Sequence, residues 1–95
     1  MTKYKKQFKT MLEENQFLFN DFKKLHDVVA SGDDSARGDF EAKGQKVLRV
    51  IRRYEDSLCA KSENSGFGKF SENLSEKFWE EVRAYLPQID EVPLQ

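Results

Sequence analysis

The sequence has few residues of the kinds that cross-link a chain, bind metal or cross a membrane. Its 95 residues include one cysteine, one histidine and two prolines. A single cysteine excludes an internal disulfide, and one Cys with one His cannot supply a zinc site. No window approaches the length of a membrane span, and no apolar run follows the basic start to suggest a signal peptide. We therefore expect one cytoplasmic domain over residues 1–95, with no membrane segment, metal or cofactor.

The chain also lacks an excess of charge of either sign. It contains 16 Lys and Arg against 17 Asp and Glu, a formal net charge of -1. No global field therefore draws it to nucleic acid or to an anionic membrane. Aromatic residues make up 13% of the chain, including eight Phe. Disordered chains lack such rings, so the composition indicates a folded domain.

Residues 4–29 predict one continuous helix. Their large apolar residues recur at alternating spacings of three and four once Asn15 is counted, which is the stripe of an amphipathic helix: Tyr4, Phe8, Met11, Leu18, Phe22, Leu25 and Val29. Asn15 is the one polar member. It is expected either to fix register or oligomeric state, or to bond a neighbouring tyrosine hydroxyl or remain in water.

A second long helix is predicted after the turn at 31–35, where Gly32 is expected to end the first helix. It begins near Asp34 or at Phe40, and its stripe is Phe40, Gly44, Val47, Ile51, Tyr54 and Leu58. Laid antiparallel, the two stripes place Phe22 against Gly44. A loop at 60–71, a shorter helix ending before Pro87 and an extended tail at 88–95 complete the prediction. The expected fold is all-α, an antiparallel three-helix bundle with two long helices, one shorter one and an extended C-terminal tail.

The short third helix covers only the first half of the first helix. The other half must be covered by Ile89, Val92 and Leu94 of the tail or by another chain, because exposed apolar patches of that size usually mark interfaces. The candidate interface is therefore Phe22, Leu25 and Val29, together with Trp79 at the margin of the third helix.

Basic residues form the second candidate surface. Lys46, Arg49 and Arg53 share one side of the second helix, Arg52 flanks them, and Lys69 of the loop is expected at the same end. Such a cluster can bind phosphates or an acidic partner. The competing interpretation is a solvated face with ion pairs such as Arg49–Asp56 and Arg52–Asp56.

Catalysis has no supporting constellation. A catalytic His26 would need a nucleophile, and Cys59 is expected near the opposite end of the second helix. The glycines at 66 and 68 lack the strand and spacing of a phosphate-binding loop. We therefore predict a small non-catalytic binding module for a protein partner or for self-association. The alternative is a nucleic-acid-binding protein that uses the basic face of the second helix and the following loop.

Overall fold

The fold is that of a computed structural model, which describes residues 2–63 and 68–93 without the side chains of 59–73. The described part is helical and contains no strand, which confirms the all-α prediction. Its elements in chain order are α1 (Lys3–Glu14), α2 (Gln16–Ala30), the 3-10 turn η1 (Asp34–Ala36), α3 (Arg37–Glu63), α4 (Gly68–Tyr85) and the 3-10 turn η2 (Ile89–Glu91).

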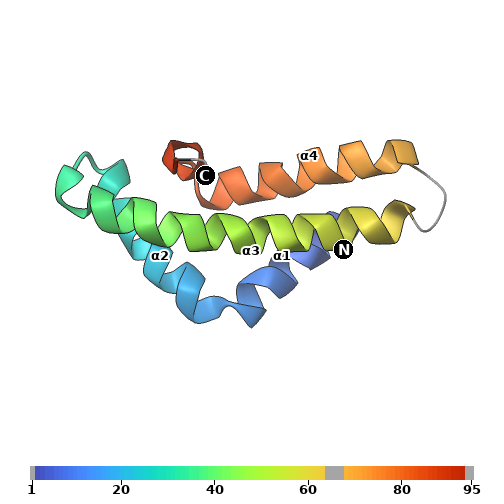
Figure 1. The fold of residues 1–95 in the computed structure, drawn as a ribbon, viewed down its shortest axis with the longest axis horizontal. Helices are drawn as coiled ribbons and strands as arrows, with labels where there is room; N and C mark the ends of the chain where they lie inside the picture. The colour runs from blue at the N-terminus through green and yellow to red at the C-terminus, as the bar shows by residue number, and fades with distance from the viewer. Residues whose placement is uncertain (1, 64–67, 94–95) are drawn as a thin grey trace.

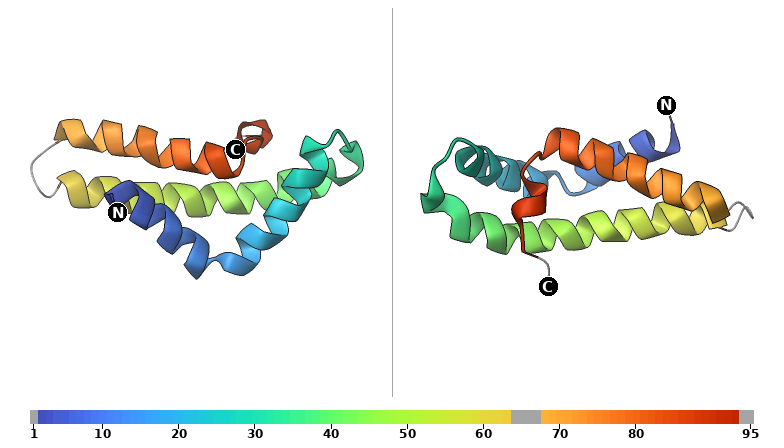
Figure 2. Two further views of the ribbon diagram at one scale, coloured as in Figure 1. Left: turned by 180° about the vertical axis from the view of Figure 1, so that it is seen from behind. Right: turned by 90° about the horizontal axis from the view of Figure 1, so that it is seen from above.

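The longest helix, α3, forms the axis of an elongated molecule with extents of 47 × 23 × 19 Å. Figure 1 shows α4 lying lengthwise along one side of α3, while α1 and α2 form a V on another side. The views of Figure 2 show that the point of the V projects away from α3 and that the tail turns from the end of α4 towards α3. In the described part of the chain, α1, α2 and α4 therefore pack around α3 in a bundle-like arrangement.

The prediction of one continuous helix over residues 4–29 is wrong. Asn15 leaves the helical region, with φ -127° and ψ 33°, and divides the stretch into α1 and α2. Its side-chain amide donates to the carbonyl of Met11 at 3.0 Å and to the hydroxyl of Tyr54 at 3.3 Å. Asparagine competes with the helical backbone in this way because its amide reaches nearby carbonyls. The expected bond to a tyrosine hydroxyl is confirmed.

The break changes which side of α2 faces the core. The buried positions of α2 are Phe19, Phe22, His26 and Val29, while Leu18 and Leu25 of the predicted stripe are only half-buried. Phe19 is 1% exposed although it is outside that stripe. The spacing Phe19–Phe22–His26 fits a helical face as well as Leu18–Phe22–Leu25 does. The contacts with α3 therefore decide between two patterns that the sequence contains equally.

The tail is not extended throughout, because η2 forms a 3-10 turn between Tyr85 and Pro93. Ile89 and Val92 are buried. Val92 lies over Gly44, where an added Cβ would come within 2.6 Å of a Val92 methyl and 3.3 Å of the Phe22 ring. The predicted contact between Phe22 and Gly44 is present, and the chain's own tail covers it. Of the two alternatives for this end of the core, the structure shows the tail.

The turn before α3 follows its sequence closely. α2 ends at Ala30 and Gly32 has φ +98°, a conformation that favours glycine. The Oδ1 atom of Asp33 accepts the amide of Ser35 and caps η1. The helix α3 begins at Arg37, between the two predicted starts. The segment between the two helices is shorter than the predicted loop at 60–71, because α3 continues to Glu63 and α4 begins at Gly68. Gly66 and Phe67 lie outside the described residues.

Candidate binding surface

A groove of about 470 Å³ lies between α2 and α3. Three lysines line it, Lys24 from α2 and Lys43 and Lys46 from α3, together with Leu25, Ala42 and two acidic residues, Asp21 and Asp39. Lys43 is within 3.5 Å of Asp21 and joins the two helices across the groove. The groove therefore combines apolar side chains with an excess of positive charge. We call it the α2–α3 groove.

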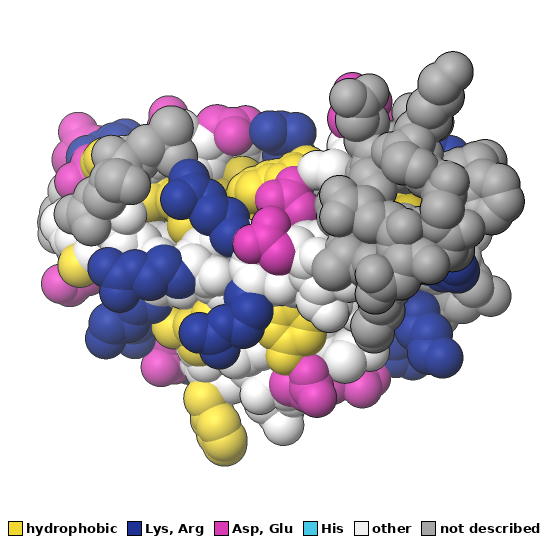
Figure 3. Space-filling view, turned by 45° about the vertical axis from the view of Figure 1, so that its right-hand side comes forward, with side chains coloured by type: hydrophobic (Ala, Val, Ile, Leu, Met, Phe, Trp, Pro, Cys, Tyr) yellow, Lys and Arg dark blue, Asp and Glu magenta, His cyan; other side chains and the backbone are white. Residues whose placement is uncertain are grey.

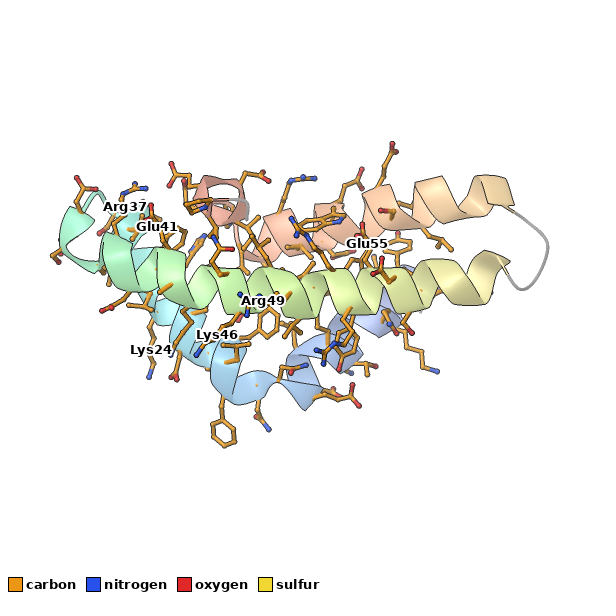
Figure 4. All side chains as sticks on the ribbon, in the orientation of Figure 1. Lys24, Arg37, Glu41, Lys46, Arg49 and Glu55 are labelled. Atoms are coloured by element: carbon orange, nitrogen blue, oxygen red, sulfur yellow. The ribbon has the colours of Figure 1, made fainter. Side chains whose placement is uncertain are left out.

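Basic side chains continue along α3 beyond the groove. Arg49 and Arg53 follow Lys46 at three and seven positions, which places all three on one side of the helix. Figure 4 shows Lys46 on the side of α3 that faces α2, near Lys24, with Arg49 further along α3. None of Lys24, Lys46, Arg49 and Arg53 forms an ion pair with any described residue. The expected pairs Arg49–Asp56 and Arg52–Asp56 are not formed.

Apolar side chains accompany these cations. Leu18 precedes Leu25 by seven residues on α2, and Val50 follows Lys46 by four on α3, so both continue the sides that line the groove. Leu18, Leu25 and Val50 are half-buried. Phe17, next to the α1–α2 break, is 83% exposed. Figure 3 shows basic side chains interspersed with hydrophobic ones on one face of the molecule. A single exposed ring is ordinary, but Phe17 stands next to the half-buried Leu18, and contiguous apolar surface favours a contact surface.

Arg52 of the predicted basic cluster is not part of this surface. Arg52 lines a separate hollow on the other side of α3, shared with Trp79 and Arg83 of α4 and with residues of the tail. A step of one residue turns a helix by about 100°, which separates Arg52 from Arg53. The side chain of Lys69 lies outside the described residues.

Trp79 is half-buried beside α3 and is held there by neighbours within the chain. Its indole N–H donates to a carboxylate oxygen of Glu55, which also accepts from Ser75. The guanidinium of Arg83 lies 5.4 Å from the ring centroid. The other three residues of the predicted interface lie in two places. Phe22 and Val29 are buried in the core, whereas Leu25 lines the α2–α3 groove.

His26 is 2% exposed and anchors the tail. Its Nε2 atom accepts the backbone N–H of Gln88 at 3.0 Å, so the ring proton resides on Nδ1, which faces Asp27 at 3.0 Å. The hydrogen bond from His26, followed by that from Lys23, holds the pKa of the Asp27 carboxyl below its ordinary value. Lys23 also donates to the carbonyl of Tyr85 at 2.9 Å. Both basic side chains therefore join α2 to the end of α4.

A second polar cluster closes the break between α1 and α2. The hydroxyl of Tyr54 donates to a carboxylate oxygen of Glu14 and accepts from Asn15. The hydrogen bond to Glu14 is the main reason that the pKa of Tyr54 is raised above its ordinary value, with burial adding to it. The amide of Gln7 donates to the Tyr54 carbonyl at 3.0 Å. These contacts fix the angle of the V and so the position of Phe17.

In the part of the chain that the structure describes, no three His, Cys, Asp or Glu side chains gather as a possible metal site. Within residues 2–63 and 68–93, no helix has both the length and the apolar character needed to cross a membrane. Comparison with protein-family models, with curated proteins and with solved structures finds no match.

Sequence reasoning placed Lys46, Arg49 and Arg53 together but missed Phe17 and Lys24 as members of the same surface. The omission follows from treating residues 4–29 as one helix, since the orientation of α2 depends on the break at Asn15. The sequence contained one indication that Phe17 is exposed. Phe17 stands in the run Phe17-Leu18-Phe19, and a helix with one buried side cannot bury three consecutive large side chains.

Proposed function

We propose that this chain is a small non-catalytic binding module for a protein partner, and that the α2–α3 groove with Phe17 is its binding surface. One observation carries the proposal: apolar side chains that reach solvent lie among three cations, Lys24, Lys46 and Arg49, which form no ion pair with any described residue. Aromatic and basic side chains are enriched at protein interfaces. We further propose a cytoplasmic setting, which the single cysteine favours, and an antiparallel bundle that serves as the scaffold.

The surroundings of the only histidine support a non-catalytic role. Both ring nitrogens of His26 are engaged, one by the Gln88 amide and one by Asp27. Cys59 is 19 positions beyond Phe40, whose ring lies 6.3 Å from that of His26. At 1.5 Å per residue this separation is roughly 28 Å along α3. A Cys–His pair within the chain would require the helix to be dismantled.

Nucleic-acid binding is the second candidate, favoured by the row Lys46, Arg49 and Arg53. Its support is narrower, because Arg52 lies on another side of α3 and the net charge is -1. Glu14 and Asp21 also lie close to Phe17 along the chain. Binding that depends on phosphate contacts should weaken steeply as salt is raised.

Capture from native lysate with and without nuclease separates the two candidates. The wild-type chain is compared with Lys46→Glu/Arg49→Glu and with a matched double charge reversal of two exposed lysines far from the groove, Lys5→Glu/Lys77→Glu. We expect a nuclease-resistant partner that the groove variant loses and the control retains. A partner lost on nuclease treatment supports the nucleic-acid alternative. Equal capture by both variants overturns the assignment of the surface.

A further inference from the structure

We infer that the α2–α3 groove accepts an acidic amphipathic helix of a partner protein. The inference rests on the proposed function and specifies the chemistry of its partner. A helix in a groove is recognised through apolar anchors at positions i, i+3 or i+4, and i+7, and flanking charges set its register. The groove presents an apolar strip with basic residues on both rims, and each feature has the spacing that such a helix requires.

The apolar strip has the length of two helical turns. Leu18 and Leu25 are seven residues apart on α2, which is about 10.5 Å along the helix. Val50 borders the strip from α3, and Phe17 stands at its end beside the break. Two apolar side chains seven residues apart on a partner helix would therefore meet the two leucines. An additional apolar side chain would reach Phe17.

The basic residues on the rims of the groove are suited to acidic residues on the flanks of a partner helix. Lys46 and Arg49 lie one helical turn apart on α3, and Lys24 stands on the α2 rim. Arg53 lies beyond the groove, in a hollow that it shares with Glu14 of α1. Lys43 is already engaged by Asp21 across the groove. Acidic residues one turn apart on one flank of the partner can reach Lys46 and Arg49 on the α3 rim, and one on the other flank can reach Lys24. Such a partner would neutralise three cations that form no ion pair with any described residue.

The residues around Phe17 favour a protein segment over a phosphate-rich surface. Glu13, Glu14 and Asp21 lie three or four positions from Phe17 on the surrounding turns. Glu13 and Glu14 are exposed. A lipid or nucleic-acid surface that engaged Phe17 would bring its phosphates close to these carboxylates, and like charges repel. A helix can instead place a neutral or basic residue at this end and acids at the other.

The test uses the full chain and three synthetic peptides of about 14 residues, close to four helical turns. The first has leucines at alternating spacings of three and four, flanked by glutamates. The second has lysines in place of the glutamates, and the third has serines in place of the leucines. Binding is followed by NMR on the labelled chain. We expect the first peptide alone to shift the amides of Leu18, Leu25 and Lys46.

Variants assign the binding to the groove. Phe17→Ser and Lys46→Glu/Arg49→Glu should each lower the affinity for the acidic peptide by about tenfold or more, a loss typical of an interface anchor. The control Lys5→Glu/Lys77→Glu should bind it as the wild type does. Circular dichroism checks that each variant is folded, which we expect since these side chains are exposed.

Several outcomes would overturn the inference. They are stronger binding of the lysine peptide, shifts confined to α4, and displacement of the acidic peptide by an RNA oligonucleotide or by anionic phospholipid vesicles. Association of the chain with itself through the same amides would show that the occupant is a second copy. The acidic peptide could show no binding while capture from lysate still yields a nuclease-resistant partner that Lys46→Glu/Arg49→Glu no longer captures. In that case this inference fails and the proposed function stands. If both tests fail, the proposed function fails too.

Discussion

Gly44 lies where α3, Phe22 and the tail come closest together. A Cβ at this position would approach the two methyl groups of Val92 to 2.6 and 2.8 Å. Glycine within a helix is about 1 kcal/mol less favourable than alanine. The close approach of Val92 is the compensating contact, since burying a valine contributes about 1.5–3 kcal/mol.

Gly44→Ala should therefore destabilise the protein by about 1 kcal/mol, because displacing Val92 outweighs the gain in helix propensity. Gly38→Ala is the matched control: it is also in α3, but no atom lies within 4 Å of the added Cβ, so its effect should be neutral or stabilising. Chemical denaturation measures both variants. In a Val92→Ala background, Gly44→Ala should be less harmful, because only the Phe22 ring then remains close to the added Cβ. Equal effects at Gly38 and Gly44 would contradict the close contact.

Tyr54 provides a test at alkaline pH. Its pKa is raised by its hydrogen bond to Glu14, so the contact stabilises the fold below the ordinary tyrosine pKa of about 10 and is lost as pH rises through the folded value. Glu14→Gln should return the pKa of Tyr54 towards its ordinary value. Tyrosinate absorbance follows the titration, with Tyr54→Phe to assign it. Glu13→Gln is the control, and an unchanged titration in Glu14→Gln would refute the bond.

At the scale of the helices, the break at Asn15 determines the shape of the molecule. Asn15→Ala removes two hydrogen bonds, each contributing about 0.5–1.5 kcal/mol, and gains about 0.5 kcal/mol of helix propensity. We expect a net loss of about 1 kcal/mol in the free energy of unfolding. Asn20→Ala, an exposed position within α2, should be neutral or slightly stabilising. If both alanines act alike in urea denaturation, the Asn15 contacts do not hold the break.

His26 joins α2 to the residues after α4. His26→Leu keeps an apolar volume but leaves the Gln88 amide without its acceptor, which should cost about 1–3 kcal/mol. Hydrogen exchange at the Gln88 amide should accelerate more than exchange in the middle of α3. Asp27→Asn is a milder change, because the Asp27 side chain is 60% exposed, and its effect should be smaller. A slow Gln88 amide in the leucine variant would contradict this role.

The helical class, the turn at Gly32 and the stop before Pro87 were predictable because they depend on nearby residues. The approach of Phe22 to Gly44 was also predictable, since the stripes before and after the turn share one period. The break at Asn15 was not, because a spacing of three and four suits a continuous helix. One contact of Asn15 at the break is with the hydroxyl of Tyr54, 39 residues away in sequence, which no local pattern indicates.

The candidate surface also contains residues that the sequence could predict and residues that it could not. Lys46, Arg49 and Arg53 were predictable as a row because they lie on a single helix. Lys24 and Phe17 join them only through the rotation of α2, which no local pattern contains. Arg52 points to another side of α3 because one residue turns a helix by about 100°, and the hollow that it shares with the tail depends on how η2 packs.

At the scale of the whole molecule, the tail completes the core. Removal of residues 89–95 deletes the buried Ile89 and Val92, which together contribute about 3–6 kcal/mol. Total stabilities of small domains are about 5–15 kcal/mol. We expect the truncated chain to lose cooperative unfolding or to associate through the uncovered surface beside Phe22 and Gly44. Calorimetry and solution mass at several concentrations test this.

A surface change near the deleted segment serves as the control. Asp90→Asn removes an exposed ion pair to Arg83, and such pairs contribute about 0–1 kcal/mol. It should therefore leave both unfolding and mass nearly unchanged. A truncated chain that unfolds as cooperatively as the wild type and remains monomeric would show that the core does not need the tail.

The docking of the tail on α2 also has a consequence for the order of synthesis. His26 and its partner Gln88 are separated by 62 residues. At about 5–20 residues per second, a ribosome needs roughly 3–12 s to make that interval. The nascent chain can therefore pack α2 on α3 early, but His26 cannot bind Gln88 until the residues after α4 have been translated. During those seconds, the part of the core that Ile89 and Val92 complete stays exposed to solvent.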